Sequence, residues 1–532
     1  MAKFDVGSGP TGRWPTSGGR DVKNGPGWRS TKYGSGKAAI LAVVLLSAAG
    51  CTRLNQWVQN GFKVGPNYGP PSAPTASEWI DHAESSVMST PVQDQAWWGV
   101  FNDPILNGLV ETARQQNLTL QSAAARIVEA RSRRSIAAGN LFPQSQQAIS
   151  NYAHAQVTRN IGLPLPGTVN VFADGFNASW EADFWGRYRR TIETADATLD
   201  ASVESYGNAM VMLVSEVATN YIQLRTFQQR LAFAHENLNI LQRSTDLAQS
   251  RFDAGTTTEL DLRQAKASLA QTQATIPPLE SGARLAANQL CVLLGMPVSD
   301  LAAQLDGASI PVAPPEVAIG IPADLLRRRP DVRRAERQVA AQCAQIGIAE
   351  ADFYPRLAVN GFIGYVANDF NDLFRGDSLT TFVLPSLQWN ILNYGRIVNN
   401  VRAQDALTQA AVLDYQQTVL NAGREVEDAL VQFIQAQRQT KALEQSVDEY
   451  RRAVEIAQTQ FEGGIADFNR VYTSQSQLVT QLDLLGTARG NIALSLVQVY
   501  KAIGGGWDAM CQGEDSVELV NQPASSSFIA PE

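Results

Sequence analysis

The sequence predicts an α+β membrane protein in which one half occurs twice, with long coiled-coil helices and four β-strands in each protomer. Two observations carry this prediction. Landmarks recur at an offset of about 209 residues, and apolar heptads persist over six or seven repeats. The chain has 532 residues, enough for several domains, and its net charge of −8 gives no basic footprint for nucleic acid.

The N-terminal region has the features of a secretory signal. An apolar run from Ala38 to Ala49 follows Lys32 and Lys37 and leads into Gly50-Cys51. It is too short for a transmembrane helix, so we expect residues 1–50 to be a signal peptide; residues 1–31 are an unusually long extension outside the fold. A cysteine after small residues resembles a bacterial lipobox, in which Cys51 receives a diacylglyceryl group. The alternative is an ordinary signal peptide with an incidental cysteine.

The mature chain begins and ends in segments without apolar periodicity. Residues 51–76 are rich in Pro, Gly, Asn and Ser and predict an extended tether, and residues 507–532 predict a flexible tail. The remaining cysteines, Cys291, Cys343 and Cys511, are too few and too dispersed for a disulfide framework. We expect Cys291 and Cys343 to be buried free thiols.

The two halves share three landmarks in the same order. The first recurs at an offset of 212 residues and the other two at 209, which places the length change in the predicted strand region. The pairs, in chain order, are Phe142-Pro143 with Tyr354-Pro355, Phe184–Arg187 with Asn393–Arg396, and Arg251–Leu269 with Gln460–Leu478.

Each half contains a long outgoing helix and a returning helix. Apolar residues recur every seven positions from Val203 to Leu238, and again from Val412 to Val454, which predicts coiled-coil packing. A helix of about 55 residues reaches about 80 Å. Pro277-Pro278 is expected to kink or break the first returning helix, because proline removes a helical hydrogen bond.

The turns between these helices contain glycine in both halves. Gly255-Thr256 and Gly463-Gly464 are the predicted hairpin tips, where glycine supplies the left-handed conformation that ends a helix. The simple interpretation is chain reversal. The functional interpretation is a tip that docks a partner, and the two are compatible.

Between the aromatic-proline step and the long helix, each half has two strand-like segments. They are expected near 145–158 and 171–184 in the first half, and near 357–366 and 379–389 in the second. Segments of this length suit a membrane-crossing strand. Four strands cannot close a barrel and open edges cannot lie in lipid, so membrane strands would require oligomerisation; three copies give twelve strands and an aqueous lumen. A soluble β-meander packed on helices is the alternative.

An enzyme is the least favoured class. The chain has three histidines, far apart, and the sequence has no phosphate-binding loop, metal-ligand cluster or Ser/His/Asp set. We therefore expect no catalytic residue, no metal and no cofactor apart from lipid on Cys51.

The order of the repeats, the two aromatic-proline steps, the glycine tips and the run Trp97-Trp98-x-x-Phe101-x-Asp103-Pro104-x-Leu106-x-x-Leu109 resemble the TolC-like outer-membrane efflux family. The lipobox points to its lipoprotein branch, the NodT/OprM-like proteins. The resemblance implies a homotrimer that shares a twelve-stranded outer-membrane β-barrel above a periplasmic α-helical coiled-coil barrel. It also implies efflux repeats at 77–298 and 325–506, joined by an equatorial linker at 299–324.

The resemblance implies a passive export duct for drugs or other small toxic compounds. A periplasmic adaptor would dock at the tips, and an inner-membrane pump of the resistance-nodulation-division type would supply energy. Two alternatives stay open: a duct for type I protein secretion, and a non-conducting coiled-coil envelope scaffold.

The family constricts its tunnel just beyond the second tip, where acidic residues are common nine and twelve places after the position of Phe461. This chain has Arg470 and Thr473 there. Asp467, or Glu259 and Asp261 near the first tip, are the candidates to supply charge instead, and Arg470 is a candidate to pair with Asp261 or Asp467. All of these side chains are equally compatible with a solvated surface.

Overall fold

The computed structural model describes residues 54–88, 96–156, 168–305, 309–324, 328–465 and 468–507. The lipidation candidate Cys51, the constriction candidate Asp467 and the predicted tail from residue 508 lie outside these residues. The chain divides into two compact units, Met1–Gln56 and Trp57–Glu532. The description that follows concerns the second unit.

The duplication is exact in the lengths of the helices. The outgoing helices α5 (Arg187–Asp253) and α10 (Arg396–Glu462) have 67 residues each, and the returning helices α6 (Glu259–Leu293) and α11 (Phe468–Ala502) have 35 each. Two shorter helices of 22 residues precede the strands, α4 (Leu118–Gly139) and α9 (Pro330–Ala351). None of the described helices combines the length and the apolarity needed to cross a membrane.

The outgoing helices are longer than the 55 residues expected from the heptads. Each begins directly after a glycine with positive φ, Gly186 at 82° and Gly395 at 80°. In the first sixteen residues of α5, small buried residues such as Ala197 and Ala201 replace the large apolar ones, so the heptad pattern starts late. Further along, the predicted row from Met210 through Val217 to Leu224 is buried as expected.

The expected break at Pro277-Pro278 does not occur. Helix α6 is assigned without interruption across both prolines. Pro277 and Pro278 each lack a backbone donor, but α6 packs against α5, and Leu279 and Ala283, which follow the prolines, are buried. Tertiary packing therefore outweighs the local cost of proline here.

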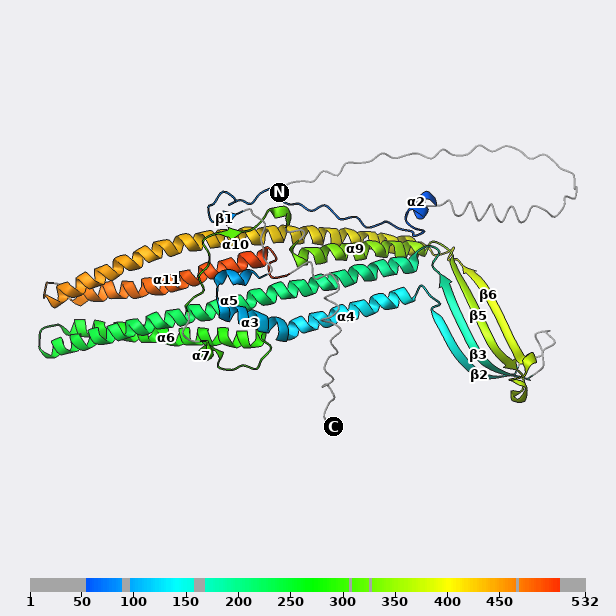
Figure 1. The fold of residues 1–532 in the computed structure, drawn as a ribbon, viewed down its shortest axis with the longest axis horizontal. Coiled ribbons are helices and arrows are strands. Elements are labelled where there is room, and N and C mark those ends of the chain that lie inside the picture. Colours follow the sequence, from blue (N-terminus) through cyan, green and yellow to red (C-terminus); the bar gives the residue numbers. More distant parts are fainter. Residues whose placement is uncertain are drawn as a thin grey trace, which may run out of the picture. The chain divides into compact units, whose positions relative to one another are not determined.

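The helices lie side by side in one layer. In this layer α5 and α10 run from the hairpin tips to the sheet (Figure 1). Helices α9 and α11 both pack against α5 and α10, and α4 and α6 pack against α5. The short helices continue the returning helices end to end. Asn117, the N-cap of α4, donates from Nδ2 to the Leu293 carbonyl at 2.9 Å, and Arg329, the N-cap of α9, donates from Nη1 to the Ala502 carbonyl at 2.7 Å.

The tryptophan motif packs around the middle of α5 and against α11. Trp97 begins η1 (Trp97–Phe101), is 1% exposed, and stacks on Tyr500 with ring centroids 5.1 Å apart. Asp103 caps α3 (Pro104–Gln116) and also accepts a 2.7 Å hydrogen bond from the Tyr221 hydroxyl.

Cys291 and Cys343 are buried free thiols, as predicted. The remaining short elements are α2 (Leu54–Gln59), β1 (Val87–Met88), α7 (Leu301–Gln304), β4 (Val317–Ala318), η3 (Pro322–Asp324), η4 (Phe370–Asp372) and η5 (Gly376–Ser378).

Four strands form one antiparallel sheet at one end of the helices (Figure 1). Their order is β2-β3-β5-β6, so the central pair joins the two halves. The predicted positions are correct to within about three residues. The strands are β2 (Ser145–Gln156), β3 (Thr168–Ala182), β5 (Arg356–Ala367) and β6 (Leu379–Gln388). The outer edges of β2 and β6 have no partner strand in the described protomer.

Candidate functional site

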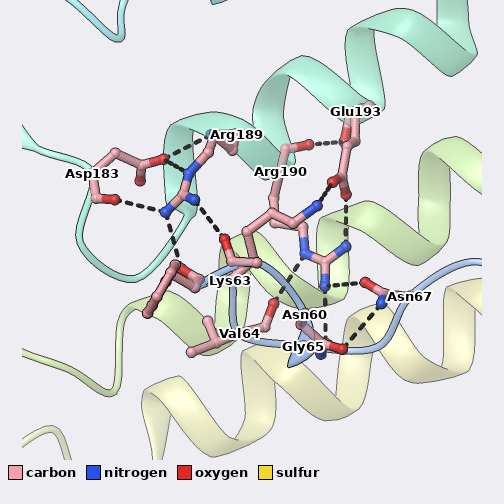
Figure 2. Close-up of polar contacts among 12 residues, drawn as sticks. Asn60, Lys63, Val64, Gly65, Asn67, Asp183, Arg189, Arg190 and Glu193 are labelled. Atoms are coloured by element: carbon pink, nitrogen blue, oxygen red, sulfur yellow. Dashed lines mark hydrogen bonds and ion pairs between the residues drawn. The ribbon is translucent and has the colours of Figure 1, made fainter. Parts of the chain in front are cut away.

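The clearest built site holds the tether against the first turn of α5 (Figure 2). Arg190 is 2% exposed, and all three nitrogens of its side chain donate hydrogen bonds. Its Nε donates to the Val64 carbonyl at 3.0 Å, and Nη2 donates to the Gly65 carbonyl at 2.9 Å and to Asn67 Oδ1 at 3.0 Å. The remaining nitrogen, Nη1, donates to Glu193 at 2.6 Å. We call residues 60–67 with Asp183, Arg189, Arg190 and Glu193 the tether clamp.

Arg189 holds the preceding part of the tether in the same way. It donates to the carbonyls of Gly61 at 2.7 Å and Phe62 at 2.9 Å. Asp183 fixes this guanidinium through a 2.9 Å contact with Nε, and it also accepts hydrogen bonds from the backbone amides of Tyr188 and Arg189. Adjacent arginines thus satisfy four backbone carbonyls of a segment that belongs to no sheet.

The tether passes where a side chain would not fit. A Cβ on Gly186 would lie 2.7 Å from Lys63 Cα, and one on Gly347 would lie 2.8 Å from both the Val64 carbonyl and Arg190 Nε. Gly65 and Gly347 face each other, with a Cβ on Gly65 only 2.4 Å from Gly347 Cα. Since Gly186 starts α5 and Gly347 lies in α9, the tether joins the two halves of the repeat.

Glu193 completes the charge balance of the clamp. Burial alone would raise the pKa of its carboxyl, but hydrogen bonds from Lys63 and Arg190 outweigh burial and hold the pKa below its usual range. The second half has no such site, because Val398 and Asn399 replace Arg189 and Arg190 at the repeat offset of 209. This difference between the halves was the sequence signal for the clamp, and sequence reasoning missed it.

Aromatic side chains surround the start of the tether. Trp57 packs on Phe62, Phe184 and Trp185 with ring centroids 4.8, 5.1 and 5.6 Å away. Phe62 and Phe184 are about half exposed. Trp185 in turn donates to the Pro355 carbonyl, so this cluster lies where the sheet meets the helices. Amphipathic rings of this kind are typical of a membrane interface.

The hairpin tips have the expected backbone geometry. Gly255 has φ of 71° and Gly464 has φ of 72°, and the following residues, Thr256 and Ile465, close the turns by donating to the carbonyls of Arg251 and Gln460, each at 2.9 Å. Gly463 has φ of −75°, a right-handed value that any residue can adopt. Thr256 and Ile465 are exposed, and their surface is available to a partner.

The constriction candidates take separate partners within the protomer. Asp261 caps α6: it accepts from Thr257 and Thr258, and these hydrogen bonds, that of Thr258 first, lower the pKa of its carboxyl. Arg470 donates to Gln460 at 3.2 Å. The proposed Arg470–Asp261 pair is therefore not formed within one protomer.

The other two candidates also have local partners. Glu259 pairs with Arg263 at 3.1 Å, and the Thr473 hydroxyl donates to the Asn469 carbonyl at 2.8 Å. Arg470 and Thr473 are exposed on α11, where a neighbouring copy or solvent can reach them. Among the described residues there is no cluster of His, Cys, Asp or Glu arranged to hold a metal ion.

The sheet has one apolar and one polar face. The strand register places Phe176, Ile363 and Leu387 on one face, where they are between 55% and 65% exposed. The opposite face carries Asn177 and Asn360, which alternate with the apolar positions. Exposed apolar side chains on a sheet of this strand length are the pattern of a strand that faces lipid on one side and water on the other.

Known proteins share this architecture. The outer membrane efflux protein family profile matches residues 109–296 and 321–505, one stretch in each half. The chain belongs to the outer membrane efflux protein family. Nodulation protein T of Rhizobium leguminosarum is 34% identical over 305 residues, which are 57% of this chain and 64% of that relative. The pyoverdine export outer membrane protein OpmQ of Pseudomonas putida is 32% identical over 331 residues, 61% of this chain and 69% of that relative.

Solved structures agree in fold over nearly the whole described chain. The outer-membrane channel OprN has a TM-score of 0.80 at 30% identity, with 84% of this chain and 99% of OprN covered. A membrane protein from Pseudomonas aeruginosa has a TM-score of 0.78 at 28% identity, with 86% of this chain and 99% of that chain covered. The predicted family, fold class and outer-membrane location are confirmed, and the family consists of transport ducts that are not enzymes.

Proposed function

We propose that this efflux-family protein is the passive export duct of a tripartite efflux system. The observation that carries the proposal is the two-faced, open-edged sheet at one end of a repeated set of long helices. A sheet with free edges cannot remain in lipid alone, so copies of the chain must complete it. In such a system the duct itself is passive, and a partner protein in the inner membrane supplies the energy.

The lipid anchor on Cys51 is part of the same proposal. Cys51 and Trp57 are six positions apart in the chain, a separation that spans at most about 20 Å. The aromatic cluster at Trp57 and the tether clamp support an anchor that enters the membrane close to the base of the sheet. The acyl groups would be a diacylglyceryl thioether and an N-acyl chain on the new N-terminal Cys51.

The hairpin tips at the ends of the long helices are the proposed contact sites for a partner protein. A periplasmic adaptor is proposed to dock at the two tips, through Gly255 and Thr256 in the first half and Gly463 and Gly464 in the second. Their exposure and distance in sequence from the sheet support this assignment. The driving protein is proposed to be an inner-membrane pump of the resistance-nodulation-division type, and the cargo to be drugs or other small toxic compounds. Relatives named for pyoverdine export and for toluene and antibiotic efflux support small-molecule cargo.

The closed end is proposed to be constricted near Arg470, Thr473, Asp467, Asp261 and Glu259. Three copies would bring three Arg470 side chains together, and a ring of like charge raises the barrier to ions of the same sign. Replacing Arg470 by alanine is expected to raise the single-channel cation conductance. The same conductance in Arg470→Ala and the wild type would remove Arg470 from the constriction.

A deletion strain tests the export function. Loss of the gene is expected to increase susceptibility to several small toxic compounds at least fourfold, and plasmid-borne wild-type protein is expected to restore resistance. Complementation with Cys51→Ser tests the anchor, because a correctly folded duct without its lipid should restore less resistance. A deletion strain that stays fully resistant but no longer secretes a polypeptide would favour a duct for type I protein secretion. A purified protein that forms no pore would favour a non-conducting coiled-coil envelope scaffold.

A further inference from the structure

Two phenylalanines lie side by side on the face of the sheet that carries Asn177 and Asn360. Phe362 on β5 and Phe382 on β6 are directly opposite each other, with ring centroids 5.8 Å apart and planes inclined by 29°. By strand alternation they share the face of Asn177 and Asn360, opposite to the apolar face of Phe176 and Ile363. Phe382 is 51% exposed on that face. Apolar rings exposed toward the aqueous side call for a functional explanation.

The rings belong to a row of side chains that crosses the whole sheet. Gln147 on β2 is opposite Asn177 on β3, Asn177 is opposite Phe362, and Phe362 is opposite Phe382. The next row carries Ser179 and Asn360, whose side chains are joined by a 2.8 Å hydrogen bond. The face therefore sets two aromatic rings beside three small polar groups.

The backbone makes room for the aromatic pair. Gly364 is two residues after Phe362 and is opposite Gly175. A Cβ on Gly364 would lie 2.8 Å from Cζ of the Phe362 ring, so that ring lies over the glycine. A larger residue at position 364 would displace the ring.

The polar and aromatic groups line one hollow. It has a volume of about 390 Å³, and Asn177, Ser179, Asn360, Phe362 and Phe382 form part of its wall. Two ring faces beside side-chain amide and hydroxyl groups are suited to a planar aromatic ligand.

We infer that this hollow is a cargo-contact site for planar aromatic molecules. The inference rests on the proposed function, which makes the face of Asn177 and Asn360 the lining of the export path. The cargo would stack on the Phe362–Phe382 pair. Three copies would repeat the site around the lumen, and the contact would be weak enough for release because one side of each hollow is open.

Open-channel block in planar bilayers tests the site with two cations of equal charge. Ethidium is planar and aromatic and carries two amino groups, whereas tetrapropylammonium has no ring. Stacking between aromatic rings contributes to binding beyond the buried apolar area. We expect Phe362→Leu/Phe382→Leu to raise the half-blocking concentration of ethidium about five- to tenfold, and to leave that of tetrapropylammonium unchanged.

Phe176→Leu is the matched control, because Phe176 lies on β3 but faces the other side of the sheet. It should not change either blocker. The channel current recorded without blocker shows that each variant folds and inserts. If the double variant does not insert, the single variant Phe382→Leu takes its place in the measurement. An ethidium block that is equal in the wild type and the conducting Phe variants overturns the site. Wild-type trimers that carry no current overturn the proposed function instead.

Discussion

At the scale of single residues, buried arginines carry the special features of this chain. Arg190 holds the tether, Arg329 joins α9 to the end of α11, and Arg225 is fully buried with its guanidinium 4.9 Å above the Tyr221 ring. Each donates to at least one backbone carbonyl of another segment, and Arg190 and Arg329 combine that bond with others through the planar fork of the guanidinium. Such contacts leave no periodic signal, so sequence patterns did not indicate them.

Replacing Arg190 by methionine is expected to destabilise the protein by about 2–4 kcal/mol. The carbonyls of Val64 and Gly65 would lose their charged donor, and Glu193 would lose one of its two cationic partners. Thermal unfolding, together with protease sensitivity of residues 60–67, measures this effect. Arg133→Met is the control: Arg133 is exposed and pairs only with Glu129 at the surface of α4, where loss of a pair costs about 1 kcal/mol or less. Equal effects of the two substitutions would contradict the clamp.

The pH dependence of stability should contain a contribution from Glu193. Its pKa is lower in the folded protein than in the unfolded chain, so its contribution is fully present above the unfolded pKa of about 4.3. That contribution is lost as the pH falls through the folded pKa. Wild-type protein is therefore expected to lose more unfolding free energy than Glu193→Gln between pH 7 and pH 3.5, measured by denaturant titration. Parallel losses in both proteins would show that Glu193 is not coupled to folding.

At the scale of elements, periodicity predicted the helices and strands well and their exceptions poorly. The heptads and strand alternation located every long helix and all four strands, because burial on one face sets both patterns. The continuous helix through Pro277-Pro278 was not foreseeable, because the packing that holds α6 comes from α5. The hollow at Phe362 and Phe382 also depends on strand register, which two distant segments define only when paired.

The joints between returning and short helices give an element-scale prediction. Gly295 and Gly464 both have positive φ, near 70°, but a Cβ on Gly295 would lie 2.4 Å from the Gln116 carbonyl oxygen, whereas one on Gly464 would meet nothing within 4 Å. Alanine at either position should cost about 1–2 kcal/mol for the left-handed backbone. Gly295→Ala should cost about 1–3 kcal/mol more because of the clash. Chemical denaturation measures the free energy of unfolding of the two variants. An equal loss in both would show that the backbone at Gly295 can shift to accommodate the Cβ.

At the scale of the whole molecule, duplication explains how one chain supplies both parts of a duct. Each half brings two strands, one pair of long antiparallel helices and one tip, and the central β3–β5 pairing joins the halves. The two halves differ in how they hold the tether and in how their returning and short helices are joined. Among the described residues, only the first half holds the tether with a pair of arginines, and only the second uses a charged joint, in which Arg329 also contacts Asp331 and Glu425.

Planar-bilayer recording of the purified, lipidated protein tests the central claim most directly. If three chains complete one sheet around an aqueous path, trimers should insert and produce discrete current steps of one size, and Arg470→Ala should enlarge them. Trimers that insert into the bilayer but never carry current would contradict the account of this protein as an export duct.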